Sequence, residues 1–289
     1  MNLFRTFKRR SKTEIALYSF VSIIFAVVAA SYLYLLVWAV LAGLKDHTEI
    51  VMEPFGLPSA LHWRNYIDVF HKLEVGGNDF VDMLFNSVYF SVVGTLLRQF
   101  IIMTFAYCCT RYKFPGSTLP YTIILIMMTL PLYGRGGAQY ILFSKLGLVD
   151  SYLYPLSAIG DAFSMVYLYY RAYFINMTGA YVEAAKIDGA GDFQCYFRIM
   201  MPMTKPLFGA MFLTGWLGSW NEYEGAMVYL PSLPTLPVGI YQFNTEMIYQ
   251  GRLDILFAAC VIVSIPAIVL FTAFNKLITT SVSIGGLKG

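Results

Sequence analysis

Long apolar stretches dominate this chain, and short polar segments separate them. Six of these stretches reach or approach the roughly 20 apolar residues that a helix needs to cross the hydrocarbon core of a bilayer. They cover residues 15–44, 83–109, 118–143, 151–175, 207–230 and 253–274. The pattern therefore predicts an all-α membrane protein with six membrane-spanning helices.

The composition excludes a water-soluble protein of ordinary surface. Of the 289 residues, 58% are hydrophobic and only 13% are charged. This composition is too hydrophobic for a protein whose whole surface faces water. We expect no metal site and no catalysis by the chain itself, because its cysteines and histidines lack metal-ligand spacing and it has no phosphate-binding loop of the G-x-x-x-x-G-K-[ST] type. The four cysteines are instead interpreted as small buried side chains.

The charges between the apolar stretches predict the orientation in the membrane. The basic N-terminus, residues 1–14, and the short loop with Arg111 and Lys113 are expected in the cytoplasm, where basic residues accumulate. The segment 45–82 holds seven carboxylates against three lysines and arginines, so it is expected outside. A membrane domain of residues 15–276, a cytoplasmic loop of residues 176–205 and a cytoplasmic tail of residues 277–289 complete this topology.

The cytoplasmic loop has its own local pattern. Residues 183–186 favour a helix, Gly189 and Gly191 interrupt it, and a second helical turn follows. Thr178 is a candidate N-cap for the first helix and Asp192 for the second. The loop is therefore expected to form two short helices joined by a bend.

The spacing in this loop resembles the cytoplasmic signature of permease subunits in binding-protein-dependent ABC importers. The matching positions are Glu183, Ala184, Ala185, Asp188, Gly189, Ala190, Ile199 and Pro202. In that family this loop is a coupling helix pair that docks on an ATPase. The resemblance implies the type I ABC importer permease fold for this chain.

Other stretches are similar to the carbohydrate branch of that family, and specifically to its second maltose-type permease subunit. They include "FNSVYFSVVGTLLRQF", "GSWNEY" and the C-terminal "SIGGLKG". The glycine-rich segment around Arg135, at Gly134, Gly136 and Gly137, departs from the family's more apolar third span. It suggests a flexible or re-entrant outer end near the translocation path.

The resemblance implies an assembly in the bacterial cytoplasmic membrane, with both termini cytoplasmic. Its expected members are a second homologous permease, an ATPase dimer that holds ATP and Mg, and an extracellular solute-binding protein that delivers a sugar. No cofactor on this chain and no nucleic acid is expected. The C-terminal tail is expected to reach the ATPase and regulate it, through Gly285, Gly286, Lys288 and Gly289.

Polar residues inside the apolar stretches are candidates for the substrate path. An ionised side chain at the centre of a bilayer costs about 2.5–3.5 kcal/mol on insertion scales, so such residues face protein or water. The candidates are Arg98, Asp161, Tyr167, Tyr170, Asn221 and Glu222. Two interpretations stay open: Arg98 pairs structurally with Asp161, Glu222 or Glu224, or it contacts substrate.

Two other functions also stay open. A permease of the same class could carry a peptide or an amino acid, although "WNEY" and "GGLKG" favour a sugar. A channel or a scaffold is the third hypothesis, and it would not need a loop that docks on an ATPase.

Overall fold

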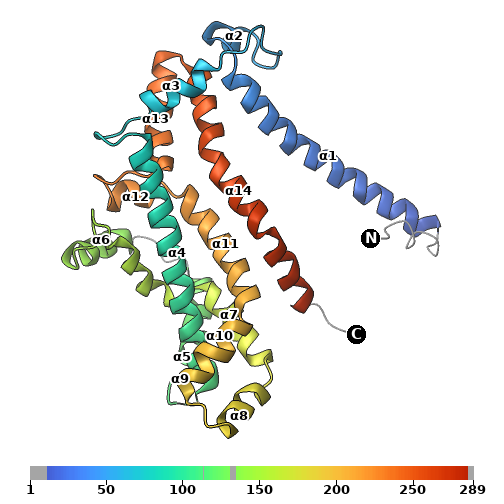
Figure 1. Cartoon of the computed structure of the whole chain (residues 1–289), viewed down its shortest axis with the longest axis vertical. Helices are drawn as coiled ribbons and strands as arrows, with labels where there is room; N and C mark the ends of the chain where they lie inside the picture. The colour runs from blue at the N-terminus through green and yellow to red at the C-terminus, as the bar shows by residue number, and fades with distance from the viewer. Residues whose placement is uncertain (1–11, 113, 131–134, 286–289) are drawn as a thin grey trace. The chain divides into compact units, whose positions relative to one another are not determined.

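The computed structural model describes residues 12–112, 114–130 and 135–285, and within them the chain forms helices and no strand. Contacts divide the chain into two compact units, made of residues 1–72 with 243–262 and of residues 73–242 with 263–289. Figure 1 labels the α-helices of both. Each unit is described by itself.

The first unit contains one long apolar helix, two short ones and parts of two later helices. Its elements are α1 (Lys12–Gly43), α2 (His47–Met52), α3 (Arg64–Lys72), the end of α13 (Leu236–Gln250) and the start of α14 (Leu253–Gly285). Nearly every side chain of α1 is exposed within this single chain. A helix that is apolar all round and exposed needs lipid or another protein around it.

Side chains of the outer segment tie the end of α1 to α3. The Asn65 amide donates to the carbonyls of Gly43 and Lys45 at 3.0 and 2.8 Å, and the Tyr66 hydroxyl donates to the carbonyl of Val40 at 3.0 Å. The Lys45 ammonium is buried and donates to the carbonyl of Glu53. These bonds satisfy polar groups that would otherwise be buried unpaired.

The second unit is built around the helix α4. Its elements are α4 (Phe80–Arg111), α5 (Leu119–Thr129), α6 (Arg135–Lys145), the 3-10 helix η3 (Tyr154–Ala162), α7 (Met165–Asn176), α8 (Ala180–Ile187), α9 (Asp192–Gln194), the π-helix η4 (Cys195–Met200), α10 (Met201–Met203), α11 (Lys205–Asn221), α12 (Glu224–Tyr229), the start of α13 and the later part of α14. Helix α4 packs against η3, α7 and α11. It starts at a capping box of Asp79 and Asp82, which satisfies free amides of its first turn.

One face of α4 carries small polar side chains that bond to its neighbours. The Ser91 hydroxyl accepts from the Trp216 indole at 3.0 Å, and Gln99 donates to the carbonyl of Met211 at 3.1 Å and accepts from the Tyr170 hydroxyl at 3.0 Å. Such bonds hold helices together where apolar burial gives little drive, as in a membrane. The apolar stretch therefore conceals a polar face that positions α7 and α11.

The structure supports three of the six predicted spans by length and composition. Among the described residues, the helices long and apolar enough to cross a membrane are Thr13–Gly43, Phe80–Arg111 and Leu253–Ala273. The predicted span 118–143 contains α5 and α6, the span 151–175 contains η3 and α7, and the span 207–230 contains α11 and α12. A single uninterrupted helix is therefore wrong for these three, and the count of six crossings stays a prediction.

Candidate functional site

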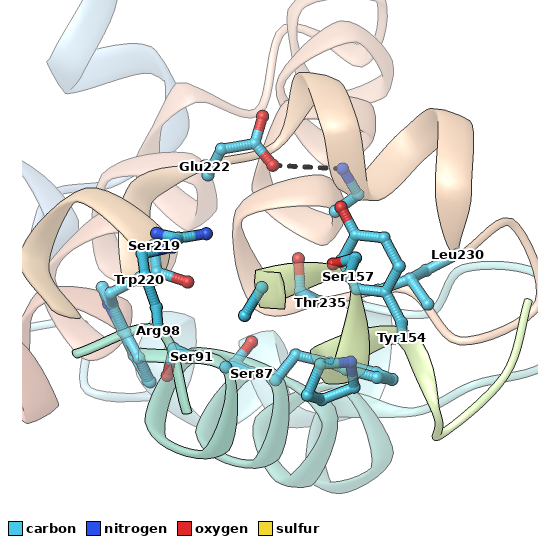
Figure 2. Close-up of a pocket in the computed structure, with 15 residues that line it drawn as sticks. Ser87, Ser91, Arg98, Tyr154, Ser157, Ser219, Trp220, Glu222, Leu230 and Thr235 are labelled. Atoms are coloured by element: carbon cyan, nitrogen blue, oxygen red, sulfur yellow. Dashed lines mark hydrogen bonds between the residues drawn. The ribbon is translucent and has the colours of Figure 1, made fainter. Parts of the chain in front are cut away.

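A small polar cavity of about 70 Å³ lies within the second unit, beside the middle of α4. Figure 2 shows its lining side chains arranged around it. The polar ones are Ser87, Ser91, Arg98, Tyr154, Ser157, Ser219, Glu222 and Thr235. They come from α4, from η3, from the end of α11 and from the segments that flank α12, so residues far apart in sequence converge on one space.

The sequence candidates Arg98 and Asp161 form an ion pair at this cavity. The Nε atom of Arg98 lies 2.7 Å from Oδ2 of Asp161, and the two side chains are 39% and 44% exposed. The pair joins α4 to the end of η3. Of the two interpretations left open, the structure shows the pairing with Asp161, while Arg98 also lines the cavity.

Glu222 marks the break between α11 and α12. Its carboxylate accepts from the backbone amides of Gly225 at 2.6 Å and Ala226 at 3.1 Å, and the bond to Ala226 is drawn in Figure 2. A carboxylate is stabilised at a helix N-terminus by these free amides and by the helix dipole. Both oxygens of Glu222 are therefore engaged at the rim of the cavity.

Thr235 brings to the cavity wall a buried hydroxyl that has no hydrogen-bond partner among the described residues. Its side chain is 6% exposed, and its hydroxyl oxygen is buried with no hydrogen bond. Its position is well fixed, because its carbonyl accepts from Gly239 at 2.9 Å and the next amide, of Leu236, donates to Ser87 at 2.7 Å. A buried hydroxyl left unsatisfied costs about 1–3 kcal/mol, so it needs an explanation.

The remaining path candidates lie elsewhere. Tyr167 and Tyr170 are fully buried in a core cluster with Met103, Phe174 and Tyr196, so this structure gives them a packing role away from the cavity lining. The amide of Asn221 is exposed and donates to the carbonyl of Leu217 in its own helix. The candidates predicted from the sequence did not include the hydroxyl-bearing residues of the cavity, which are Ser87, Ser91, Tyr154, Ser157, Ser219 and Thr235.

The predicted coupling loop forms two helical arms around a bend: the first arm is α8, and the second consists of α9, η4 and α10. Helix α8 has no buried residue, and Ile187 and Phe193 are 87% and 75% exposed. Gly189 has a φ of 85°, a left-handed conformation that glycine adopts at little cost. Of the motif residues, Glu183, Ala184, Asp188 and Gly189 are exposed, and Ala185, Ala190, Ile199 and Pro202 are half-buried.

An ion pair closes the bend. The Lys186 ammonium lies 2.8 Å from Oδ1 of Asp192, with both side chains more than half exposed. The hydrogen bond and the charge of Asp192 raise the pKa of Lys186. The pair links the end of α8 to the start of α9 across Gly189.

The second arm of the loop is fixed to the core. The Tyr196 and Thr104 hydroxyls lie 2.6 Å apart, and the Tyr196 ring lies 4.7 Å from that of Tyr107. The Tyr173 hydroxyl donates to the carbonyl of Met203 at 2.8 Å. The exposed first arm is therefore joined to a second arm that packs on α4 and α7.

Both predicted caps in this loop are wrong. Helix α8 begins after Gly179, without a side-chain cap, so Thr178 lies one residue too early. Gly191 precedes α9, and Asp192 is its first residue. Asp192 makes its ion pair with Lys186 instead. In both cases a glycine occupies the cap position, where backbone freedom replaces a capping oxygen.

The C-terminal candidates are described only in part. Helix α14 continues to Gly285, well beyond the predicted end of the sixth span at residue 274. Gly286, Lys288 and Gly289 lie outside the described residues, as does Gly134.

Comparison with known proteins identifies the class of the protein. The fold matches the structure of a bacterial ABC transporter involved in the import of the acidic polysaccharide alginate, with a TM-score of 0.74 at 21% identity, covering 92% of this chain and 98% of that one. The sequence matches the family described as binding-protein-dependent transport system inner membrane component over residues 3–284. The chain belongs to this family, and the resemblance inferred from the loop is confirmed.

Two curated relatives share nearly the full length. The chain is 28% identical to the arabinooligosaccharides transport system permease protein AraQ of Bacillus subtilis, covering 93% of this chain and 95% of AraQ. It is 29% identical to the diacetylchitobiose uptake system permease protein NgcG of Streptomyces coelicolor, covering 88% and 83%.

Proposed function

We propose that this chain is one of two permease subunits in an ATP-driven importer that carries a sugar or an oligosaccharide across the bacterial cytoplasmic membrane. The observation that carries the proposal is its similarity, over most of both lengths, to permeases named for arabinooligosaccharides and diacetylchitobiose. In this proposal the chain crosses the membrane six times, with both termini in the cytoplasm. A solute-binding protein delivers cargo outside.

The cytoplasmic loop couples the chain to the ATPase in this proposal. Helix α8 has no buried side chain, and Ile187 and Phe193 expose apolar surface beside charged groups, a composition suited to a protein interface. The second arm is fixed to α4 and α7 through Tyr196 and Tyr173. Movement of α8 by the ATPase would therefore be transmitted to α4, which lines the cavity.

In this proposal ATP is hydrolysed by the partner ATPase and not by this chain. ATP and Mg would bind the ATPase subunits, and this chain would supply the path and the docking loop. The C-terminal residues from Gly285 onward would reach the same ATPase and regulate its hydrolysis.

Co-purification and uptake test this proposal together. Expression of the chain with its neighbouring genes should recover a second permease and an ATPase, and the complex with its solute-binding protein should accumulate a sugar in vesicles when ATP is supplied. Glu183→Lys reverses a charge on the exposed face of α8 and should abolish cargo-stimulated ATP hydrolysis. Glu74→Lys, at an exposed carboxylate of the outer segment, is the matched control.

Two results would contradict the proposal. ATP-dependent accumulation of peptides or amino acids, with no sugar carried, would remove the sugar assignment and keep the importer. Recovery of the chain alone, with normal function of the Glu183→Lys variant, would remove the coupling assignment.

A further inference from the structure

The polar cavity beside α4 has the chemistry of a subsite for hydroxyl groups. Its serine, threonine and tyrosine side chains both donate and accept hydrogen bonds, as sugar hydroxyls do. Ser87 and Ser91 already accept from Leu236 and Trp216. Thr235, by contrast, holds a buried hydroxyl oxygen at the cavity wall that has no partner among the described residues, so this group is available to hydrogen-bond a molecule in the cavity.

The charges around the cavity disfavour an acidic guest. The cation Arg98 is already paired with Asp161 at 2.7 Å, and Glu222 adds a second carboxylate that is bound to two backbone amides. The charged groups of the lining are therefore Arg98 and Glu222, and the carboxylate of Asp161 already pairs with Arg98. A carboxylate entering this space would add a third negative charge beside a single cation that is already paired.

The size of the cavity limits the guest to a part of a sugar. A cavity of about 70 Å³ has space for a few water molecules, at about 10–15 Å³ each by this measure. Trp220 lines it but is 2% exposed and packs against Trp216 with ring centroids 5.3 Å apart, so its face is not free to stack on a sugar ring. The site would therefore bind the edge of one unit through hydroxyl groups.

We infer that this cavity is a subsite for the hydroxyl-bearing edge of one uncharged sugar unit, and that Thr235 hydrogen-bonds to it. The inference rests on the proposed function and adds the substrate class: neutral sugars, and not uronates or other acidic ones. Arg98 then acts as a positioning residue: its ion pair with Asp161 holds η3 on α4, and its guanidinium does not bind the cargo.

Variants of Thr235 test the contact. Thr235→Val keeps the shape of the side chain and removes the hydroxyl, whereas Thr235→Ser keeps the hydroxyl. One hydrogen bond corresponds to about a threefold to tenfold change in binding, so the KM for sugar uptake by the assembled importer should rise by that factor in Thr235→Val and stay near the parent value in Thr235→Ser. Thr214→Val is the matched control, because that hydroxyl bonds within its own helix.

A binding experiment without the solute-binding protein tests whether the cavity prefers uncharged sugars to acidic ones. Saturation-transfer NMR on the assembled permease–ATPase complex compares galactose, arabinose and N-acetylglucosamine with galacturonate and glucuronate. A signal from at least one neutral sugar should weaken in Thr235→Val, and the uronates should give no signal that depends on Thr235.

Three outcomes would overturn the inference. The first is an unchanged KM for uptake in Thr235→Val, which would mean that the cavity holds only water. The second is an NMR signal from the uronates that depends on Thr235 as strongly as the signal from the neutral sugars does. The third is the lack of a Thr235-dependent signal from every neutral sugar. If the parent importer carries no sugar at all, the proposed function itself fails, and this result is distinct from the first outcome, where the parent carries sugar.

Discussion

The ion pair between Arg98 and Asp161 allows a quantitative prediction. A double-mutant cycle of Arg98→Gln, Asp161→Asn and the double variant measures the coupling between the two side chains. A buried pair that loses one partner costs about 3–5 kcal/mol. Here the side chains are 39% and 44% exposed, so the coupling must be discounted for solvent. We expect about 1 kcal/mol, at the upper end for exposed pairs, because the 2.7 Å contact is a close charge-assisted hydrogen bond.

The assay is reversible unfolding of the assembled complex in mixed micelles, with the free energy of unfolding measured for each corner of the cycle. The chain offers a matched control in Arg64 and Asp68, an exposed pair 3.8 Å apart on α3. That looser pair should show a coupling of about 0.3–0.5 kcal/mol, as helix pairs four residues apart do.

Sugar uptake adds a second measurement to the same variants. If the pair is structural, Arg98→Gln should slow uptake and the double variant should recover most of it, because no unpaired carboxylate is left. If sugar uptake does not recover in the double variant, the structural role is refuted, and a contact between Arg98 and the cargo becomes the better explanation. A coupling above about 3 kcal/mol would refute the exposure on which the magnitude depends.

Two further predictions concern the loop and the topology. Gly189→Ala should cost about 1–2 kcal/mol because of its left-handed backbone, and it should keep ATPase coupling because an added Cβ meets no atom within 4 Å. Gly189→Trp places a large side chain at the docking surface and should abolish cargo-stimulated ATP hydrolysis. Equal hydrolysis rates in the two variants would count against docking at this bend. In a chain whose native cysteines are replaced, an impermeant thiol reagent should label Ser59→Cys from outside and miss Ser117→Cys, and external labelling at residue 117 would overturn the six-span topology.

The sequence predicted the elements whose signal is local and long. The apolar stretches at 15–44, 83–109 and 253–274 correspond to α1, α4 and α14, because many consecutive apolar residues leave no alternative to a helix. The bend at Gly189 was also predictable, since glycine interrupts a helix and permits a positive φ.

Features set by distant partners were not predictable from the pattern. Asp192 reads as a cap by residue type, yet it pairs with Lys186 across the bend. Helix α13, at Leu236–Gln250, was missed because its residues mix polar and apolar types without a long apolar run. Thr235 precedes this helix, and nothing in its neighbourhood distinguishes it from any other threonine in a connecting segment.

The helix breaks that the hydropathy pattern concealed also explain where the cavity lies. Irregular backbone at membrane depth is tolerated only where protein or a water-filled space surrounds it. The 3-10 helix η3 and the break at Glu222 both line the cavity, as does Thr235 between α12 and α13. A continuous helix keeps its backbone groups in its own hydrogen bonds, whereas at the break after α11 the Glu222 carboxylate accepts from the amides of Gly225 and Ala226. The cavity of the second unit thus takes its polar lining from interrupted elements as well as from α4.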